Sequence, residues 1–261
     1  MAKIISMVNQ KGGVGKTTTS INLSSCMGQL GVKVLLIDID PQGNCTTGLG
    51  ISKSNIKHSV YDLLTDNIDV NKAIIKTKYK NLSIIPASIN LAGIDSELIE
   101  KSFNDETFKK SEQLKICLEK ISDNYDYIFI DCPPSLGILT SNALAASNTV
   151  MIPVQCEFYA IEGILQLLNT ITLAQRSINP DLLIEGVLLT MYDPRTNLGA
   201  EVVENIRSYF KEKVYDTIIP RLVRISEAPS YGKPINFYDS ESKGSMAYIN
   251  LAKEVMSRNG Q

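Results

Sequence analysis

Asn9-Gln10-Lys11-Gly12-Gly13-Val14-Gly15-Lys16-Thr17-Thr18-Thr19 is the stretch that decides how this chain folds. The apolar stretch 3–8 before it predicts a strand, and 17–30 after it predicts a helix that ends at Gly31. Glycines in such a turn let backbone N–H groups point inward, and the helix N-terminus adds its positive end. The stretch therefore predicts a loop that cradles phosphate groups.

Two side chains of this loop have the chemistry that a bound nucleotide needs. Lys16 is placed to reach the β- and γ-phosphates, and the hydroxyl of Thr17 is placed to hold Mg²⁺. The usual pattern, G-x-x-x-x-G-K-[ST], requires glycine where this chain has Gln10. The alternative is a glycine turn that binds no ligand, but strand, loop, Lys-Thr pair and helix all occur in the required order, which favours the nucleotide site.

Short apolar runs alternate with segments of helical period along the rest of the chain. Strands are predicted at 32–38, 82–85, 127–131, 149–154 and 184–190, and helices at 91–102, 107–122, 136–147, 160–177, 198–212 and 244–257. Residues 52–80 and 95–113 are polar with weak periodicity, which predicts peripheral helices and loops. The alternation is typical of an α/β fold, a doubly wound and mostly parallel sheet flanked by helices. We expect one domain over residues 1–261.

Three carboxylates follow predicted strands. Asp38 and Asp40 come at the end of 32–38, and Asp131 ends 127–131. Sheets of this kind bind ligands at the carboxyl ends of their strands. Each carboxylate taken alone could equally be a strand-end cap or a surface charge, but three of them beside one phosphate loop favour a nucleotide site.

Composition limits the other functions. The chain has 26 Lys and Arg against 28 Asp and Glu, a formal net charge of −2, which argues against a protein coated in positive charge but allows a local basic patch. Its five cysteines are odd in number and show no C-x-x-C spacing, so we expect reduced thiols. His58 is the only histidine, which excludes sites that need several. Apolar runs are strand-length and no signal-peptide pattern is present, so a cytoplasmic protein is expected.

Lysine at position 11, before Gly-Gly-Val-Gly-Lys-Thr-Thr, is the deviant loop of the ParA/MinD group of P-loop ATPases. Over nearly its whole length the chain resembles the ParA/Soj partition ATPases of that group. The resemblance implies an Mg²⁺-dependent ATP hydrolase. It is carried by the opening stretch together with Asp38-Ile39-Asp40-Pro41-Gln42-Gly43-Asn44, Ile130-Asp131-Cys132-Pro133-Pro134, Pro153-Val154-Gln155-Cys156-Glu157 and Glu227-Ala228-Pro229-Ser230.

The resemblance also implies roles for individual residues. Lys11 resembles the signature lysine, which crosses an ATP-sandwich dimer to the partner's nucleotide, as an arginine finger does in trans. Asp40 resembles the carboxylate that orients the attacking water, and Asp131 resembles the Walker B carboxylate that holds Mg²⁺ through water. Lys11, Lys16 and Asp40 are thus expected to be catalytic, and Thr17 and Asp131 to bind the metal. The expected phosphate-binding residues are Lys11, Gly12, Gly13, Val14, Gly15, Lys16, Thr17 and Thr18.

Adenine packs in this family near the segment that matches Ile219-Pro220-Arg221. Pro220 and Leu222 are therefore the expected base-binding residues. The family usually has asparagine where this chain has Leu222, so a backbone contact must replace that side chain if it matters for the base. The preference for ATP over GTP follows from the resemblance alone.

The client of such an ATPase is either DNA or a membrane. A MinD-like protein needs a C-terminal amphipathic membrane helix, whereas 246–256 offers no basic face and predicts core packing. Arg195 and Arg224 match arginines that serve nonspecific DNA binding in the ParA/Soj type. Read without the resemblance, the cations of this region alternate with acidic side chains, as on a solvated face. These acidic side chains are Glu201, Glu204, Glu212 and Asp216.

The sequence and the resemblance together predict a ParA-type partition ATPase. ATP is expected to drive a homodimer that binds double-stranded DNA nonspecifically, and a ParB-type centromere-binding protein is expected to stimulate hydrolysis and release. The protein would be cytoplasmic and nucleoid-associated when ATP-bound. The alternative is a MinD-like, membrane-cycling ATPase that regulates division or placement.

Overall fold

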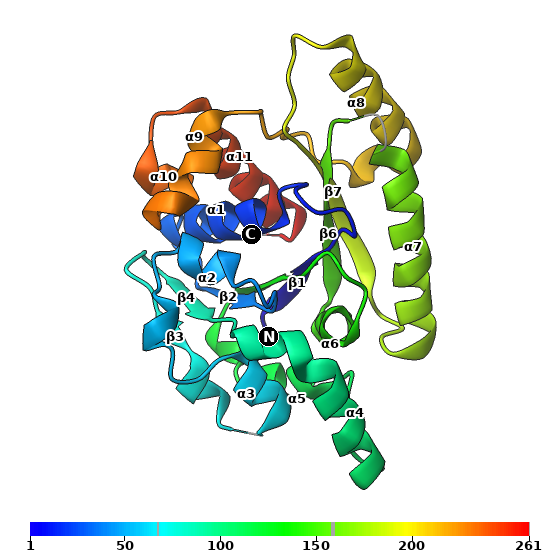
Figure 1. Ribbon diagram of the computed structural model, residues 1–261. Coiled ribbons are helices and arrows are strands. Elements are labelled where there is room, and N and C mark those ends of the chain that lie inside the picture. The colour runs from blue at the N-terminus through cyan, green and yellow to red at the C-terminus, as the bar shows by residue number, and fades with distance from the viewer. Residues whose placement is uncertain (67, 158–159, 261) are drawn as a thin grey trace.

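The computed structural model describes residues 1–66, 68–157 and 160–260. Its centre is a seven-stranded sheet in the order β3-β4-β2-β5-β1-β6-β7 (Figure 1). Neighbouring strands are parallel except β3 and β4, which are antiparallel, so the predicted doubly wound and mostly parallel sheet is confirmed. The strands are β1 (Lys3–Met7), β2 (Val34–Asp38), β3 (Ile75–Lys76), β4 (Leu82–Ile85), β5 (Tyr127–Asp131), β6 (Thr149–Gln155) and β7 (Leu183–Thr190).

Helices cover both faces of the sheet (Figure 1). The α-helices are α1 (Lys16–Gln29), α2 (Asn44–Gly48), α3 (Val60–Thr65), α4 (Ile94–Asn104), α5 (Gln113–Glu119), α6 (Ile138–Ala146), α7 (Ala160–Ser177), α8 (Asn197–Phe210), α9 (Val223–Glu227), α10 (Ile235–Tyr238) and α11 (Lys243–Arg258). Short 3-10 turns are η1 (Lys53–Asn55), η2 (Val70–Ala73), η3 (Ile89–Gly93), η4 (Ser122–Asn124), η5 (Lys211–Lys213) and η6 (Ala228–Tyr231).

The central strands separate two hydrophobic cores. All five residues of β5 are buried, and because side chains alternate along a strand, Tyr127 and Phe129 face one core while Ile128 and Ile130 face the other. The first core contains α1 and α11, and the second contains α3 to α8. The chain's apolar runs thus form a sheet that is covered on both sides, which leaves the ends of the strands for function.

The C-terminal helix packs as expected. Tyr248, Leu251 and Val255 of α11 are buried in the core that α1 also enters, so the predicted core packing of this segment is confirmed. Within the ranges that the structure describes, we find no helix with the length and apolar character needed to cross a membrane.

Other predictions were too coarse. The helix predicted at 107–122 is wrong in its first part, because the Asp105 carboxylate accepts hydrogen bonds from the backbone and hydroxyl of Thr107 and so forms a turn; helix begins only at Gln113. The strand β3 was not predicted within 52–80, and α2, α9 and α10 were also missed. These elements are two to five residues long, too short for a periodic signal.

All five cysteines are buried and free. Burial raises the pKa of Cys26 to about 12 and that of Cys156 to about 11. The thiols are therefore protonated and shielded from reagents at neutral pH.

Candidate nucleotide site

The loop between β1 and α1 has the backbone shape that its glycines permit. Gly13 has φ +75° and Gly15 has φ +92°, in the left-handed region that L side chains rarely adopt. Thr190 at the end of β7 donates its hydroxyl hydrogen to Val14 O at 2.9 Å and so fixes the loop to the sheet. Gly15 then caps α1, which begins at Lys16.

Lys16 is buried in this loop, with only 7% of the residue exposed. Its Nζ donates to the carbonyl oxygens of Asn9, at 2.9 Å, and Lys11, at 3.2 Å. Burial lowers the pKa of Lys16, and the nearby carboxylate of Asp131 acts in the opposite direction. A phosphate would offer this ammonium a charged acceptor, which makes shorter and stronger hydrogen bonds than carbonyl oxygens do.

Two buried carboxylates lie side by side beneath the loop, because Asp38 of β2 pairs in register with Asp131 of β5. Burial, and then the neighbouring Asp131, raises the pKa of Asp38 to about 7. Burial raises the pKa of Asp131 to about 6, although the neighbouring hydroxyls of Thr17 and Ser20 oppose this. A cation beside this pair would favour its charged form.

The carboxylate oxygens of Asp38 and Asp131 differ in their hydrogen-bond partners. Asp38 Oδ2 accepts from the backbone N and the hydroxyl of Thr46, both at 2.7 Å. Asp131 Oδ1 accepts from Ser20 Oγ at 2.8 Å, whereas its Oδ2 is buried without a partner in the described part of the chain. An unsatisfied carboxylate oxygen next to the Thr17 hydroxyl is the hard oxygen donor set that Mg²⁺ prefers. The residues present therefore fit a magnesium ion.

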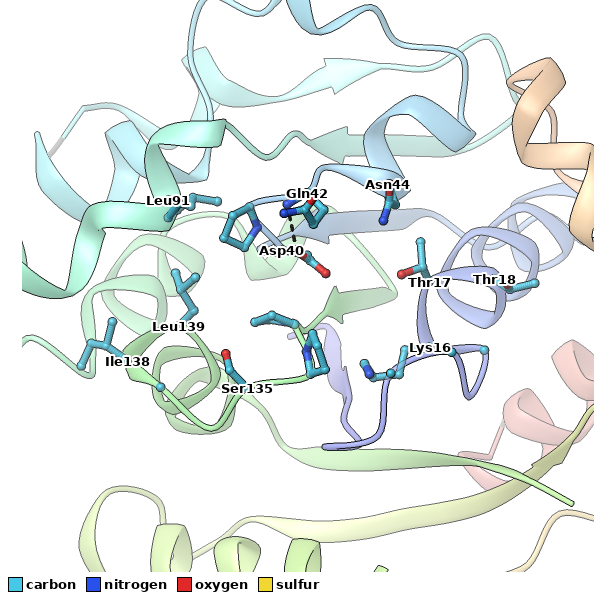
Figure 2. A pocket seen from close by; sticks show the side chains of 18 of the residues that line it. Lys16, Thr17, Thr18, Asp40, Gln42, Asn44, Leu91, Ser135, Ile138 and Leu139 are labelled. Carbon is cyan, nitrogen blue, oxygen red and sulfur yellow. Dashed lines mark hydrogen bonds between the residues drawn. The ribbon is translucent and has the colours of Figure 1, made fainter. Parts of the chain in front are cut away.

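Asp40 projects into the same cavity from the loop after β2. Figure 2 shows its carboxylate opposite Lys16 and Thr17, with Gln42 and Asn44 beside it. Its Oδ1 accepts from the backbone N of Gln42 at 2.9 Å, which fixes the direction of the side chain. Carboxylate, ammonium and hydroxyl thus surround one space.

That space is a cavity of about 610 Å³ at the carboxyl ends of β1, β2 and β5. It extends from the phosphate loop past Asp40 to Leu91 and Leu139 (Figure 2). Asp95 and Pro134 also line it. The structure therefore brings together Lys16, Thr17 and Asp40 at the sheet edge that sequence analysis predicted.

Lys11 points elsewhere. Its Nζ lies 3.2 Å from Glu157 Oε2, in the connection between β6 and α7, and the two side chains are 40% and 46% exposed. The amide of Gln155 donates to the other Glu157 oxygen. Lys11 is therefore not among the residues that line the cavity.

A second cavity of about 330 Å³ adjoins the first and shares Gly15, Thr18 and Met191 with it. Pro220 and Leu222, the expected base-binding residues, line it. Further lining residues come from the end of β7 and the residue after it, from α9 and from α11, and sequence analysis missed them, because no local signal shows which side chains of these segments face a common space. These missed residues are Thr190, Met191, Ile225 and Tyr248.

The two candidate DNA-binding arginines lie on the surface and line neither cavity. Arg195 is 86% exposed and makes a bidentate contact with Asp193, at 2.8 Å from Nε and 2.6 Å from Nη2. Arg224 lies 3.7 Å from both Glu227 and Asp239. Each guanidinium is thus already beside a carboxylate.

A glycine loop with a buried lysine, at the end of a parallel strand and beside a strand-end carboxylate, defines a P-loop nucleotide-binding protein. Residues 2–184 match the family model described as an AAA domain. The chain belongs to the Soj/ParA family of chromosome-partitioning ATPases. It is 58% identical to the sporulation initiation inhibitor protein Soj of Bacillus subtilis over 98% of both chains. Identity to the chromosome partitioning protein ParA of Caulobacter vibrioides is 49%, over 98% of this chain and 94% of that one.

Solved structures show the same fold with nucleotide. The cobyrinic acid a,c-diamide synthase of Mycobacterium smegmatis with bound ATP analogue and magnesium is 33% identical, with a TM-score of 0.84, over 100% of this chain and 98% of that one. The septum site-determining protein MinD of Pyrococcus horikoshii, complexed with Mg-ADP, is 26% identical with a TM-score of 0.81, over 100% and 98%.

Proposed function

We propose that this protein hydrolyses ATP to ADP and phosphate with Mg²⁺, and that ATP switches it into a homodimer that binds duplex DNA nonspecifically during chromosome partitioning. The observation that carries the catalytic part is the meeting of Lys16, Thr17 and Asp40 at one cavity, with the buried carboxylate of Asp131 next to Lys16 and Ser20. The names of the relatives and the nucleotide in the similar structures support it.

The roles follow from the positions of the groups. Lys16, released from Asn9 O and Lys11 O, would bind the β- and γ-phosphates. Thr17 and Asp131 would hold Mg²⁺, which offsets phosphate charge when bound. Asp40 would accept a hydrogen bond from the attacking water, since its carboxylate faces the cavity and its direction is fixed. Pro220 and Leu222 would contact the base in the adjoining cavity.

Dimerisation would complete the site. Gly12 and Gly13 are exposed at the mouth of the cavity, and Lys11 faces away from it. A second protomer placed face to face could therefore bring its own Lys11 to this nucleotide, where a cation from outside stabilises the transferring phosphoryl group. We also propose that residues 1–261 act as one domain, since strands between Lys3 and Thr190 form one sheet and the C-terminal α11 packs on α1 against it.

DNA is the client that we propose, with Arg195 and Arg224 as phosphate contacts and a ParB-type protein as the stimulating partner. The dimer would be nucleoid-associated, and hydrolysis would release it. Burial of the apolar side of α11 leaves that helix without the free apolar face that membrane binding needs.

One paired experiment tests this function. The protein with ATP and Mg²⁺ is added to a fluorescent duplex and, separately, sedimented with liposomes; Lys16→Ala is the control that should lose ATP in calorimetry. We expect ATP-dependent binding to DNA and none to liposomes. Binding to liposomes alone would instead support the MinD-like alternative, and unchanged ATP affinity of Lys16→Ala would overturn the loop assignment.

A further inference from the structure

Two long segments of the chain contain lysines but no acidic residue. Residues 41–61 and 70–94 hold no aspartate or glutamate, although the whole chain has a formal net charge of −2. Positive charge is therefore concentrated in these segments, and association with a charged partner follows such a local field more than the total charge. Their lysines are Lys53, Lys57, Lys72, Lys76, Lys78 and Lys80.

The fold brings part of this charge beside another exposed cation. Segment 70–94 contains the β3–β4 hairpin at the outer edge of the sheet, with Lys78 exposed in its turn. A Cβ on Gly50 would lie 2.9 Å from Gly232 O and 3.5 Å from Lys78 Nζ. Lys233, which directly follows Gly232 in the chain, is exposed. Lys78 and Lys233 therefore lie close together, although 155 positions separate them in the sequence.

Tyr79 fastens the hairpin to the segment after α9. Its hydroxyl donates to Gly232 O at 2.7 Å, and its ring centroid lies 4.8 Å from that of Phe237 in α10. Lys78 Nζ lies 5.4 Å from the Tyr79 ring. The lysine thus projects from a fixed base, so little additional backbone ordering would accompany contact with a partner.

The surface continues from Lys233 to the proposed DNA contacts. Tyr231 stacks on Tyr238 with centroids 5.0 Å apart, and the guanidinium of Arg224 lies 5.8 Å from the Tyr238 ring. Figure 1 shows α9 and α10 between the start of α8 and the β3–β4 hairpin. We call this surface the basic strip, made up of Arg195, Arg221, Arg224, Lys233 and Lys78.

The basic strip runs from beyond one edge strand, β7, to the other, β3. Seven strands have six spacings, which together measure about 29 Å at roughly 4.8 Å each. Phosphates follow each other at about 3.4 Å along each strand of a duplex, so the width of the sheet corresponds to about eight base pairs. Arg195 follows the carboxyl end of β7 and Lys78 precedes the amino end of β4, so the strip spans at least this width.

We propose that the backbone of duplex DNA lies along the basic strip, and that Lys78 and Lys233 bind phosphates beyond Arg224. This inference rests on the proposed DNA binding and extends it. Lysines on an edge strand also prevent pairing with other strands. That explanation accounts for Lys76, which lies in β3 itself, but not for Lys78 and Lys233, which lie outside it.

The test compares Lys78→Ala and Lys233→Ala with Lys120→Ala. Lys120 is a matched control because it is exposed and directly follows α5, which packs on the other face of the sheet. Each is made in an Asp40→Ala background with ATP, and binding to a labelled 24-base-pair duplex is followed by anisotropy over a salt series. Each strip variant removes two contacts per dimer, so the slope of log affinity against log salt should fall by about 1.8. Lys120→Ala should keep the parent slope, and melting curves check that all variants fold.

The outcomes separate this inference from the function on which it rests. If Arg224→Ala weakens binding while Lys78→Ala and Lys233→Ala behave like Lys120→Ala, the DNA contact ends at Arg224 and the inference is wrong. If the parent protein binds no duplex with ATP, the proposed function itself fails. Phosphatidylglycerol vesicles form a third arm: ATP-dependent binding to them that Lys78→Ala abolishes would assign the surface to lipid and overturn the inference.

Discussion

Lys11 and Glu157 form an ion pair, with 3.2 Å between Nζ and Oε2, that holds the loop lysine on the β6–α7 connection of its own protomer. The two residues are 146 positions apart. Any role of Lys11 in a second protomer would require this contact to break, so the pair would compete with the proposed dimerisation.

Glu157→Gln should therefore favour the ATP-bound dimer. Both side chains are close to half exposed, and pairs of this kind contribute about 0–1 kcal/mol each. Two pairs break per dimer, so the dimer dissociation constant should fall by up to about 30-fold. Sedimentation equilibrium with ATP and Mg²⁺ in an Asp40→Ala background measures it, with Glu119→Gln as the control. An unchanged or weaker dimer would show that the pair does not restrain Lys11.

Asp40→Ala should bind ATP and dimerise but hydrolyse at least about 100-fold more slowly, because a positioned base contributes 10²–10⁴-fold. Asp95→Ala is the matched control, since Asp95 is another carboxylate that lines the same cavity. Phosphate release gives the rate and calorimetry the affinity. Near-normal turnover would remove Asp40 from the water-orienting role.

Gly12→Val should bind nucleotide yet fail to dimerise. A Cβ at Gly12 would meet nothing within 4 Å in its own protomer, so the added methyls should leave the fold intact and obstruct only a facing chain. Gly163→Val is the control, because its Cβ would also meet nothing within 4 Å. Size-exclusion chromatography with ATP and Mg²⁺ reads the result; a normal dimer peak for Gly12→Val would contradict face-to-face assembly.

Arg195→Ala and Arg224→Ala should each weaken DNA binding and reduce its salt slope by about 1.8 per dimer, with similar losses on any duplex sequence. Arg176→Ala at the end of α7 serves as the control. The arginines must leave their carboxylates to reach phosphate, so the loss in affinity should be smaller than for an unpaired cation. Unchanged slopes for both would place the DNA surface elsewhere.

The stability of the nucleotide-free protein should depend on pH through Asp38. Burial and Asp131 raise the pKa of Asp38 from its ordinary value of 3.8 to about 7, so folding favours its protonated form. This contribution is complete below about pH 4 and is lost as the pH rises through about 7. Asp38→Asn lacks this contribution. Between pH 5 and pH 8 the melting temperature of the variant should therefore fall less than that of the parent protein, and at pH 8 the variant should melt several degrees higher. An equal fall in melting temperature for both proteins would contradict the raised pKa of the buried Asp38.

The sequence predicted the loop and most strands because their signals are local. The Lys-Thr pair follows its glycines directly, and 82–85 and 127–131 were predicted with their observed bounds as continuous apolar runs. Asp38, Asp40 and Asp131 were expected near the loop because parallel strands end at one edge.

The remaining features depend on contacts between distant segments. Tyr248 lines the second cavity through the packing of α11 on α1, and β3 exists only because Ile75 and Lys76 pair with β4. Neither arrangement has a periodic signal in its own segment. The partner of Asp131, Ser20, was missed because it lies within the helix interior, one turn beyond the Lys-Thr pair.

The burial of all five native thiols makes the protein suitable for site-specific dye attachment. A maleimide reacts with an accessible thiolate, and the native thiols are inside the two cores. Phe103 near the end of α4 is 83% exposed and belongs to the face opposite α1, α9 and α11. Phe103→Cys would therefore supply one reactive position, from which a fluorophore could report the arrival and departure of single molecules on stretched DNA without removal of any native cysteine.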